Sequence, residues 1–166
     1  ESLEKFELKE LLSHCPCCAN SKIFFYTEKF GYRMDQCQAC LHIFTNPMPS
    51  DDALEFYYNS EFKDFENQFF LESFEERIPI FSQRLELLAK CGAGSKVLDV
   101  GSAVGIFLEA NARFEKPFDI VACDISHHAC RLLKERFSGT TVLNKNVTDL
   151  EPANFDVVTL WDTFEH

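Results

Sequence analysis

Two pairs of cysteines near the start of the chain have the spacing of a metal site. Cys15 and Cys18 form one Cys-x-x-Cys pair, Cys37 and Cys40 form another, and residues 19–36 separate the pairs. Each pair can turn two thiolates toward one ion, and four thiolates complete a tetrahedral zinc site with no position left for water or substrate. The spacing therefore predicts a structural zinc ribbon with Cys15, Cys18, Cys37 and Cys40 as ligands.

Neighbouring residues leave alternatives for the ligand set. Cys17 stands beside Cys18, and the two-residue spacing favours Cys18 as the second ligand. His14 and His42 flank the pairs and could each replace a cysteine. Buried free thiols, or disulfides in an exported protein, are the interpretations without metal. The other cysteines fit no pairing pattern, and we expect them to be small buried apolar residues: Cys91, Cys123 and Cys130.

A glycine-bearing segment later in the chain has the pattern of a cofactor-binding turn. Residues 97–108 read as a strand, a turn that begins at Gly101, and the start of a helix. Glycine lets the backbone approach a ligand closely, and the amide groups of such a turn can point at it. A nicotinamide fingerprint also needs glycine at the third and sixth positions of the turn, where this chain has Ala103 and Ile106. We therefore reject a nicotinamide-dependent oxidoreductase.

An acidic residue ends the next predicted strand. Asp124 follows the apolar run 120–123, about twenty residues beyond the turn, where a carboxylate can accept both hydroxyls of a ribose. Such an acid is weak evidence by itself, because an ordinary α/β domain with coincidental glycines could also have one. Combined with the turn and with the terminal segment 155–166, it becomes specific.

The elements that position these residues predict three regions. Residues 1–48 form the zinc ribbon, residues 49–94 a helical linker or cap, and residues 95–166 the N-terminal half of a Rossmann-like, doubly wound parallel sheet. In this last region β-branched runs alternate with amphipathic segments, which indicates βαβ units of the α/β class. The predicted strands are 96–100, 119–123, 141–144 and 156–161.

Helix signals fill the middle region and the connections between strands. Ser50 is a predicted N-cap, and a longer helix is predicted over 68–90 with a break or kink at Pro79 and a stop at 91–94. Ser126 is the predicted N-cap of the helix that follows Asp124.

Composition and charge exclude several function classes. The chain has 166 residues, 46% of them hydrophobic, which is enough for one core and a small satellite module. A net charge of −11 argues against a nucleic-acid site, because phosphate binding depends on Lys and Arg. The apolar runs are too short to cross a membrane, and the acidic start does not resemble a secretory signal. We therefore expect a cytoplasmic protein with reduced cysteines.

Taken together, these motifs resemble the class I S-adenosylmethionine-dependent methyltransferases that begin with a zinc ribbon and are related to ubiquinone-type O-methyltransferases. The resemblance rests on both cysteine pairs, on Phe44-Thr45-Asn46-Pro47, on Tyr57-Tyr58, on the glycine turn, on Asp124-Ile125-Ser126 and on the terminal run 155–166. It covers most of the chain, and it implies a methyl transfer to a small-molecule acceptor.

The resemblance also implies residue roles. The turn from Gly101 to Gly105 would wrap the methionyl part of the cofactor, with Asp99 holding the turn. Asp124 would bind the ribose, and Ile125 would pack on the adenine. Asn146 would accept from the adenine amino group, with Asp149 as a competitor, and the backbone N–H of Val147 would reach the ring. The implied cofactor-binding residues are Asp99, Gly101, Ser102, Ala103, Gly105, Asp124, Ile125, Asn146 and Val147.

Two departures from the family pattern bear on activity. Ala103 stands where glycine is most frequent, and binding is expected to survive if the backbone angle there is ordinary. Glu165 and His166 are the acid and imidazole closest to the expected methyl donor, with helix capping as an equal alternative, so no catalytic base is assigned. We expect the strands that shape the acceptor pocket to follow His166 in a longer protein, and this stretch alone to be inactive. A non-catalytic binding module with a degenerate scaffold is the alternative function.

Overall fold

The computed structural model describes residues 7–151 and 154–164. The chain divides into two compact units, Glu1–Phe56 and Tyr57–His166. The helical region predicted at 49–94 is shared between the two units, so its status as a separate linker or cap remains a prediction. None of the described helices is long and apolar enough to cross a membrane.

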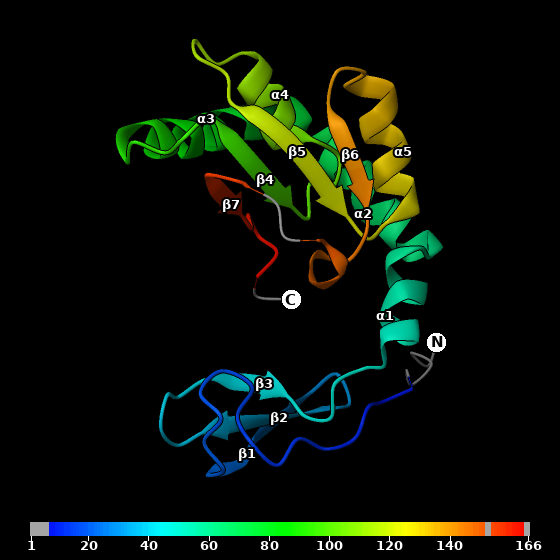
Figure 1. Ribbon diagram of the computed structural model, residues 1–166. Helices are drawn as coiled ribbons and strands as arrows, with labels where there is room; N and C mark the ends of the chain where they lie inside the picture. The colour runs from blue at the N-terminus through cyan, green and yellow to red at the C-terminus, as the bar shows by residue number, and fades with distance from the viewer. Residues whose placement is uncertain (1–6, 152–153, 165–166) are drawn as a thin grey trace. The chain divides into compact units, whose positions relative to one another are not determined.

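The first unit is built on a three-stranded antiparallel sheet in the order β1-β2-β3 (Figure 1), with strands β1 (Ile23–Lys29), β2 (Tyr32–Cys37) and β3 (Ile43–Thr45). Phe30 and Gly31 connect β1 to β2 with positive φ values of 54° and 80°, as the tightest hairpin turns require. Its buried apolar cluster contains two cysteines and Phe44, with Ile23 packed against them. A core this small needs an additional source of stability, such as a metal ion.

A buried polar network ties the segment before the first cysteine pair to this sheet. The Asn46 side chain accepts from the backbone N–H of Leu12 at 2.8 Å and donates to the Leu12 carbonyl at 3.1 Å. The same amide donates to Asp35 at 2.8 Å, and Arg33 donates to the other oxygen of Asp35 at 2.7 Å. Asp35 and Asn46 are each 1% exposed, so every polar atom in the network needs its partner.

Three helices follow, and they differ from the prediction in one respect. They are α1 (Asp51–Tyr58), α2 (Glu61–Glu72) and α3 (Phe74–Lys90). Ser50 caps α1 by accepting from the N–H of Ala53 at 3.1 Å. The predicted break at Pro79 is wrong, because the helices divide at Ser73, whose hydroxyl donates to the Phe69 carbonyl, and Pro79 lies inside α3. Pro79 is the sixth residue of α3 and lacks the N–H that would bond to the carbonyl of Glu75, so the helix continues there with one backbone hydrogen bond fewer.

The second unit contains the predicted α/β sheet. Strands β4 (Lys96–Val100), β5 (Asp119–Asp124), β6 (Thr141–Asn144) and β7 (Val157–Thr159) are all parallel and lie in the order β6-β5-β4-β7. They alternate with α4 (Ile106–Ala112), α5 (His127–Arg136) and the short helix η1 (Val147–Asp149). The Rossmann-like fold class is thereby confirmed, although β7 is shorter than the predicted 156–161.

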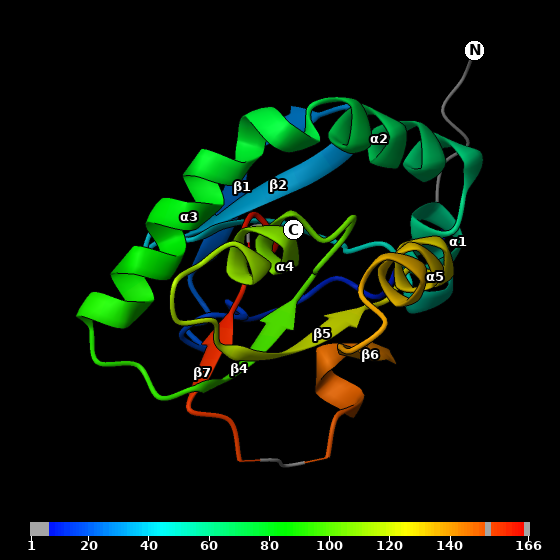
Figure 2. The same cartoon turned by 90° about the horizontal axis from the view of Figure 1, so that it is seen from above.

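Helices α3, α4 and α5 lie on one face of the parallel sheet (Figures 1 and 2). The core on this face includes Val97, Ile120 and Phe107, whereas Leu98, Val100 and Cys123 form a cluster on the opposite face. The order of strands reverses between β4 and β7. In open α/β sheets, ligands bind at the carboxyl ends of the strands beside such a switch point. A ligand site is therefore expected at the loops after β4, β5 and β7.

Candidate functional site

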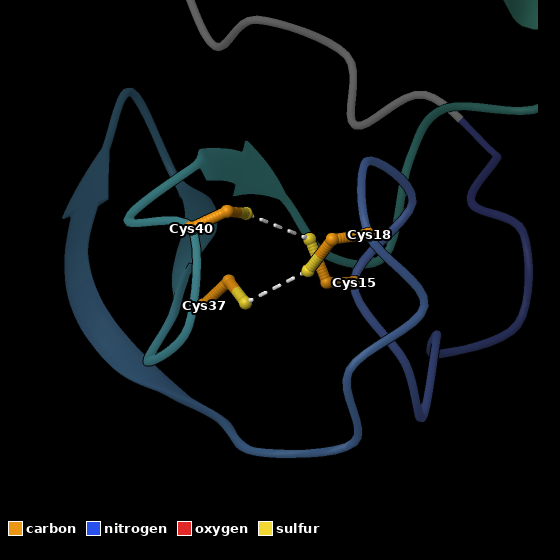
Figure 3. Close-up of side chains that lie close together, drawn as sticks. All are labelled: Cys15, Cys18, Cys37 and Cys40. Carbon is orange, nitrogen blue, oxygen red and sulfur yellow. Dashed lines mark hydrogen bonds between the residues drawn. The ribbon is translucent and has the colours of Figure 1, made fainter.

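The four cysteines predicted as zinc ligands lie together in the first unit (Figure 3). Cys15 Sγ is 3.6 Å from Cys40 Sγ, and Cys18 Sγ is 3.6 Å from Cys37 Sγ. All four sulfurs lie within 4.8 Å of one another. Sulfurs bound tetrahedrally to one zinc at about 2.3 Å are about 3.8 Å apart. The distances therefore fit a closed four-thiolate site.

Both cysteine pairs adopt the same local turn. The N–H of Ala19 donates to the Cys15 carbonyl at 2.9 Å, and the N–H of Leu41 donates to the Cys37 carbonyl at 3.0 Å. Ala19 and Leu41, directly after each pair, have positive φ values of 57° and 62°. This conformation is unfavourable for residues with a side chain. Two such turns, one for each cysteine pair, direct the four sulfurs to one point.

Hydrogen bonds within the cluster separate the pKa values of two neighbouring thiols, since contacts with the other cysteines help to raise that of Cys18 to about 12 while that of Cys37 falls. The backbone N–H of Cys40 is the leading cause that lowers the pKa of Cys37 to about 7. A thiolate is the form of cysteine that binds metal, so this backbone donor prepares Cys37 as a ligand.

The alternative ligands lie outside the cluster. Cys17 is exposed and is not among the four clustered cysteines. His14 pairs with the Ser13 hydroxyl at 2.8 Å, and the His42 ring stacks on Phe44.

Of the remaining cysteines, Cys123 and Cys130 are buried as expected, and burial raises the pKa of each to about 11. Cys91 is exposed, which contradicts the expectation of burial, because it lies just beyond the end of α3 rather than in a packed element.

The glycine turn after β4 depends on its glycines. Gly101 and Gly105 have φ values of 74° and 85°, which residues with a side chain rarely adopt. A Cβ atom at Gly101 would collide with the side chain of Thr163, and one at Gly105 would collide with the ring of Phe137. The turn is also anchored, because the N–H of Gly101 donates to the Cys123 carbonyl of β5 at 2.8 Å.

Ala103 does not have the ordinary backbone angle on which the prediction depended. Its φ is 46°, which places it in the left-handed region. This conformation is unfavourable by about 1 kcal/mol for a residue with a Cβ atom. A compensating contact is present, because the N–H of Ala103 donates to Asp124 Oδ2 at 2.8 Å. The strained residue therefore links the glycine turn directly to the acid at the end of β5.

Asp124 lies at the carboxyl end of β5 and is 9% exposed. Its other oxygen, Oδ1, accepts from the N–H of Ser126 at 2.8 Å, and Ser126 caps α5. Sequence reasoning missed Asn144, whose amide donates to the carbonyls of Asp124 and Ile125 at 3.0 and 3.1 Å. Asn144 ends β6, and a polar residue at the end of the strand next to Asp124 was the signal available in the sequence.

Asp99 faces the interior between β4 and β7. It is 2% exposed, and its Oδ1 accepts from the Thr159 hydroxyl at 2.8 Å. Burial raises the pKa of Asp99 to about 6, and the bond from Thr159 opposes this rise. Ser102 is buried too, and its hydroxyl donates to the Asp99 carbonyl at 2.8 Å, which fixes the start of the turn.

The predicted adenine contacts follow β6 and are exposed. Asn146 Oδ1 accepts from the N–H and the hydroxyl of Thr148, at 3.1 and 3.0 Å, and so caps the helix η1. Val147 and Asp149 lie in the same short helix. An adenine amino group at Asn146 would therefore have to share or replace the contact with Thr148. Glu165 and His166 lie outside the described residues.

Comparison with known proteins gives a family model and matches among solved structures. The family model of a methyltransferase domain matches residues 73–166, which is more than half of the chain. The crystal structure of the plantazolicin methyltransferase BamL, in complex with a triazolic desmethylPZN analog and SAH, is similar at 20% identity with a TM-score of 0.45. The match covers 63% of this chain and 41% of the BamL chain, so this chain spans less than half of that length. No curated protein matches.

Proposed function

The chain belongs to the methyltransferase domain family, whose model matches residues 73–166, and we propose that the protein methylates a small-molecule acceptor with S-adenosylmethionine. The observation that carries the proposal is the bond between Ala103 and Asp124, because it joins the glycine turn to the acid beside the switch point. These two features are the parts that a nucleoside cofactor needs at the carboxyl ends of parallel strands.

The cofactor would extend across the ends of β4, β5 and β6. In this proposal the turn from Gly101 to Gly105, including Ser102 and Ala103, binds the methionyl part, and Asp99 supports the turn. Asp124 binds the ribose, and Ile125 packs on the adenine. Asp124 Oδ2 accepts from the N–H of Ala103 and Oδ1 from the N–H of Ser126, which holds the carboxylate in place at the end of β5. Asn146 accepts from the adenine amino group, and the backbone N–H of Val147 reaches the adenine ring.

S-adenosylmethionine, when bound, supplies an electrophilic methyl group. The contribution of this chain is to hold the reacting atoms in line, since proximity and orientation account for much of the lowering of the activation barrier in such transfers. Asp124, Asp99 and the turn are held by hydrogen bonds within the protein, so little reorganisation is needed when the cofactor binds.

We also propose that Cys15, Cys18, Cys37 and Cys40 bind one structural zinc ion. Four thiolates leave no coordination position for a substrate, so the ion would stabilise the first unit rather than take part in the reaction. The small apolar core of this unit supports the proposal, because it contains only one large buried side chain, that of Phe44, among the described residues.

A second candidate is a non-catalytic binding module. The left-handed backbone at Ala103 favours it, because this residue departs from the glycine expected in an efficient turn. So does the capping role of Asn146 Oδ1, which occupies the predicted adenine acceptor.

Isothermal titration calorimetry of the full-length protein with S-adenosylmethionine and with NAD separates the candidates. The methyltransferase proposal expects saturable binding of S-adenosylmethionine and none of NAD. Absence of heat with S-adenosylmethionine in a folded protein would favour the binding module, and preference for NAD would overturn both.

A further inference from the structure

The solvent side of α3 carries an ordered row of side chains. The opposite side of this helix packs against α4 (Figure 2), where Phe81 contacts the Phe107 ring. On the solvent side, exposed residues recur at alternating steps of four and three positions, which keeps them on one face of a helix. We call them the outer row of α3, and in chain order they are Glu76, Ile80, Gln83, Leu87 and Lys90.

Two members of the outer row are large and apolar although they face solvent. Ile80 is 50% exposed and Leu87 is 53% exposed. They are seven residues apart, so they lie two helical turns from each other on the same face. An exposed apolar strip bounded by polar residues is typical of a protein interaction surface. The strip therefore identifies the outer row as a surface to which a partner could bind.

The two ends of the outer row carry opposite charges. Glu76 lies in the first turn of α3 and has no ion pair in the part of the chain that the structure describes. The Lys90 side chain, in the last turn, is 75% exposed. Its contact with Glu86 is 3.5 Å long and joins two exposed groups, so it contributes little. Both charges can therefore pair with a partner molecule.

The outer row is also chemically symmetric about Gln83. An aliphatic and then an acidic residue precede it, and an aliphatic and then a basic residue follow it. In a second α3 running antiparallel about a twofold axis at Gln83, Ile80 would meet Leu87 of the second copy, and Glu76 would meet its Lys90. A parallel arrangement would instead bring like charges together, and it would align the helix dipoles unfavourably. The row thus complements an antiparallel copy of itself.

We propose that α3 forms a homodimer interface, in which the outer row docks antiparallel on the outer row of a second copy. A second copy is the occupant because each member of the row meets a matching side chain there. A helix of 17 residues is about 25 Å long, and such a pair is smaller than a standard interface. The dimer therefore dissociates readily on dilution. This inference does not depend on the proposed methyl transfer.

Sedimentation velocity of the full-length protein at low salt, over about 1–200 µM, provides the first test. The parent should change from monomer to dimer as the concentration rises. Leu87→Glu places a charge against Ile80 of the second copy and should weaken dimerisation at least about tenfold. Lys116→Glu is the control, because Lys116 is exposed in the loop between α4 and β5, away from the outer row. It should behave as the parent.

Exchange of the two charges tests the direction of pairing. Glu76→Lys and Lys90→Glu should each weaken dimerisation about tenfold, since like charges then meet at both ends of the interface. The double variant restores both pairs and should dimerise as the parent does. An equimolar mixture of the two single variants should also associate, because each then meets the opposite charge. A general effect of net charge would produce neither recovery.

Several results would overturn the proposal. A parent that stays monomeric over the whole range would do so, and if Leu87→Glu then lowered its melting temperature, another part of the same chain would cover the outer row. A dimer that none of these substitutions weakens would use a different surface. Failure of both the double variant and the mixture to associate would contradict antiparallel pairing. Circular dichroism checks the fold of each variant, and the charge exchange decides the matter if Leu87→Glu does not fold.

Discussion

Replacing Cys18 by serine tests the zinc site, and the neighbouring Cys17 offers a matched control. Cys18 Sγ lies 3.6 Å from Cys37 Sγ within the four-sulfur cluster, whereas Cys17 is exposed and outside it. The two substitutions change the same atom in adjacent residues. We expect Cys18→Ser to lose zinc and to unfold the first unit, and Cys17→Ser to behave as the parent.

The magnitude follows from the number of ligands and the size of the core. Structural zinc contributes about 10–16 kcal/mol in small zinc domains, so one of four thiolates accounts for about 3 kcal/mol, or about a hundredfold in zinc affinity. The apolar cluster of two cysteines, Phe44 and Ile23 cannot replace that contribution. Without zinc, the buried contact between Asn46 and Leu12 should open as well, because it joins the same segment to the sheet.

Metal analysis of the purified protein provides the assay, together with thiol labelling in the native state. The parent and Cys17→Ser should contain about one zinc per chain, with the clustered thiols protected from labelling. Cys18→Ser should contain far less and should expose them. A parent without zinc whose eight cysteines all label in the native state would refute the site. Zinc loss from Cys17→Ser but not from Cys18→Ser would reassign the ligand.

Two further predictions concern the second unit. Asp124→Ala should weaken S-adenosylmethionine binding at least about tenfold, since each charge-assisted hydrogen bond contributes about 1.5–3 kcal/mol, and Asp149→Ala should weaken it less; calorimetry showing parental affinity for the Asp124 variant would contradict the ribose assignment. Asp99→Asn should stabilise the protein at pH 7.5 but not near pH 4, as measured by urea unfolding. A pKa raised from 3.8 to about 6 means that the folded state pays for ionisation as pH rises through this range, by up to about 3 kcal/mol above pH 6. An equal effect of Asp99→Asn at both pH values would show that ionisation of Asp99 is not responsible.

Several features could be read from the sequence because they depend on local spacing. The two Cys-x-x-Cys pairs, the glycines of the turn and the serine caps at Ser50 and Ser126 act within a few residues. The alternation of strands and helices after Lys96 predicted a parallel sheet, since parallel strands need crossovers. Local patterns of this kind determine which elements form.

Other features required the tertiary structure, because they join residues that are far apart in the chain. No local pattern predicts that Arg84 stacks on Trp161, or that Asn144 holds the carbonyl of Asp124. The left-handed backbone of Ala103 likewise depends on its bond to Asp124, a residue of the next strand. The two cysteine pairs and the glycine turn are local to the chain, whereas packing selects the distant side chains that meet them, since such contacts form when the sheet orders its strands.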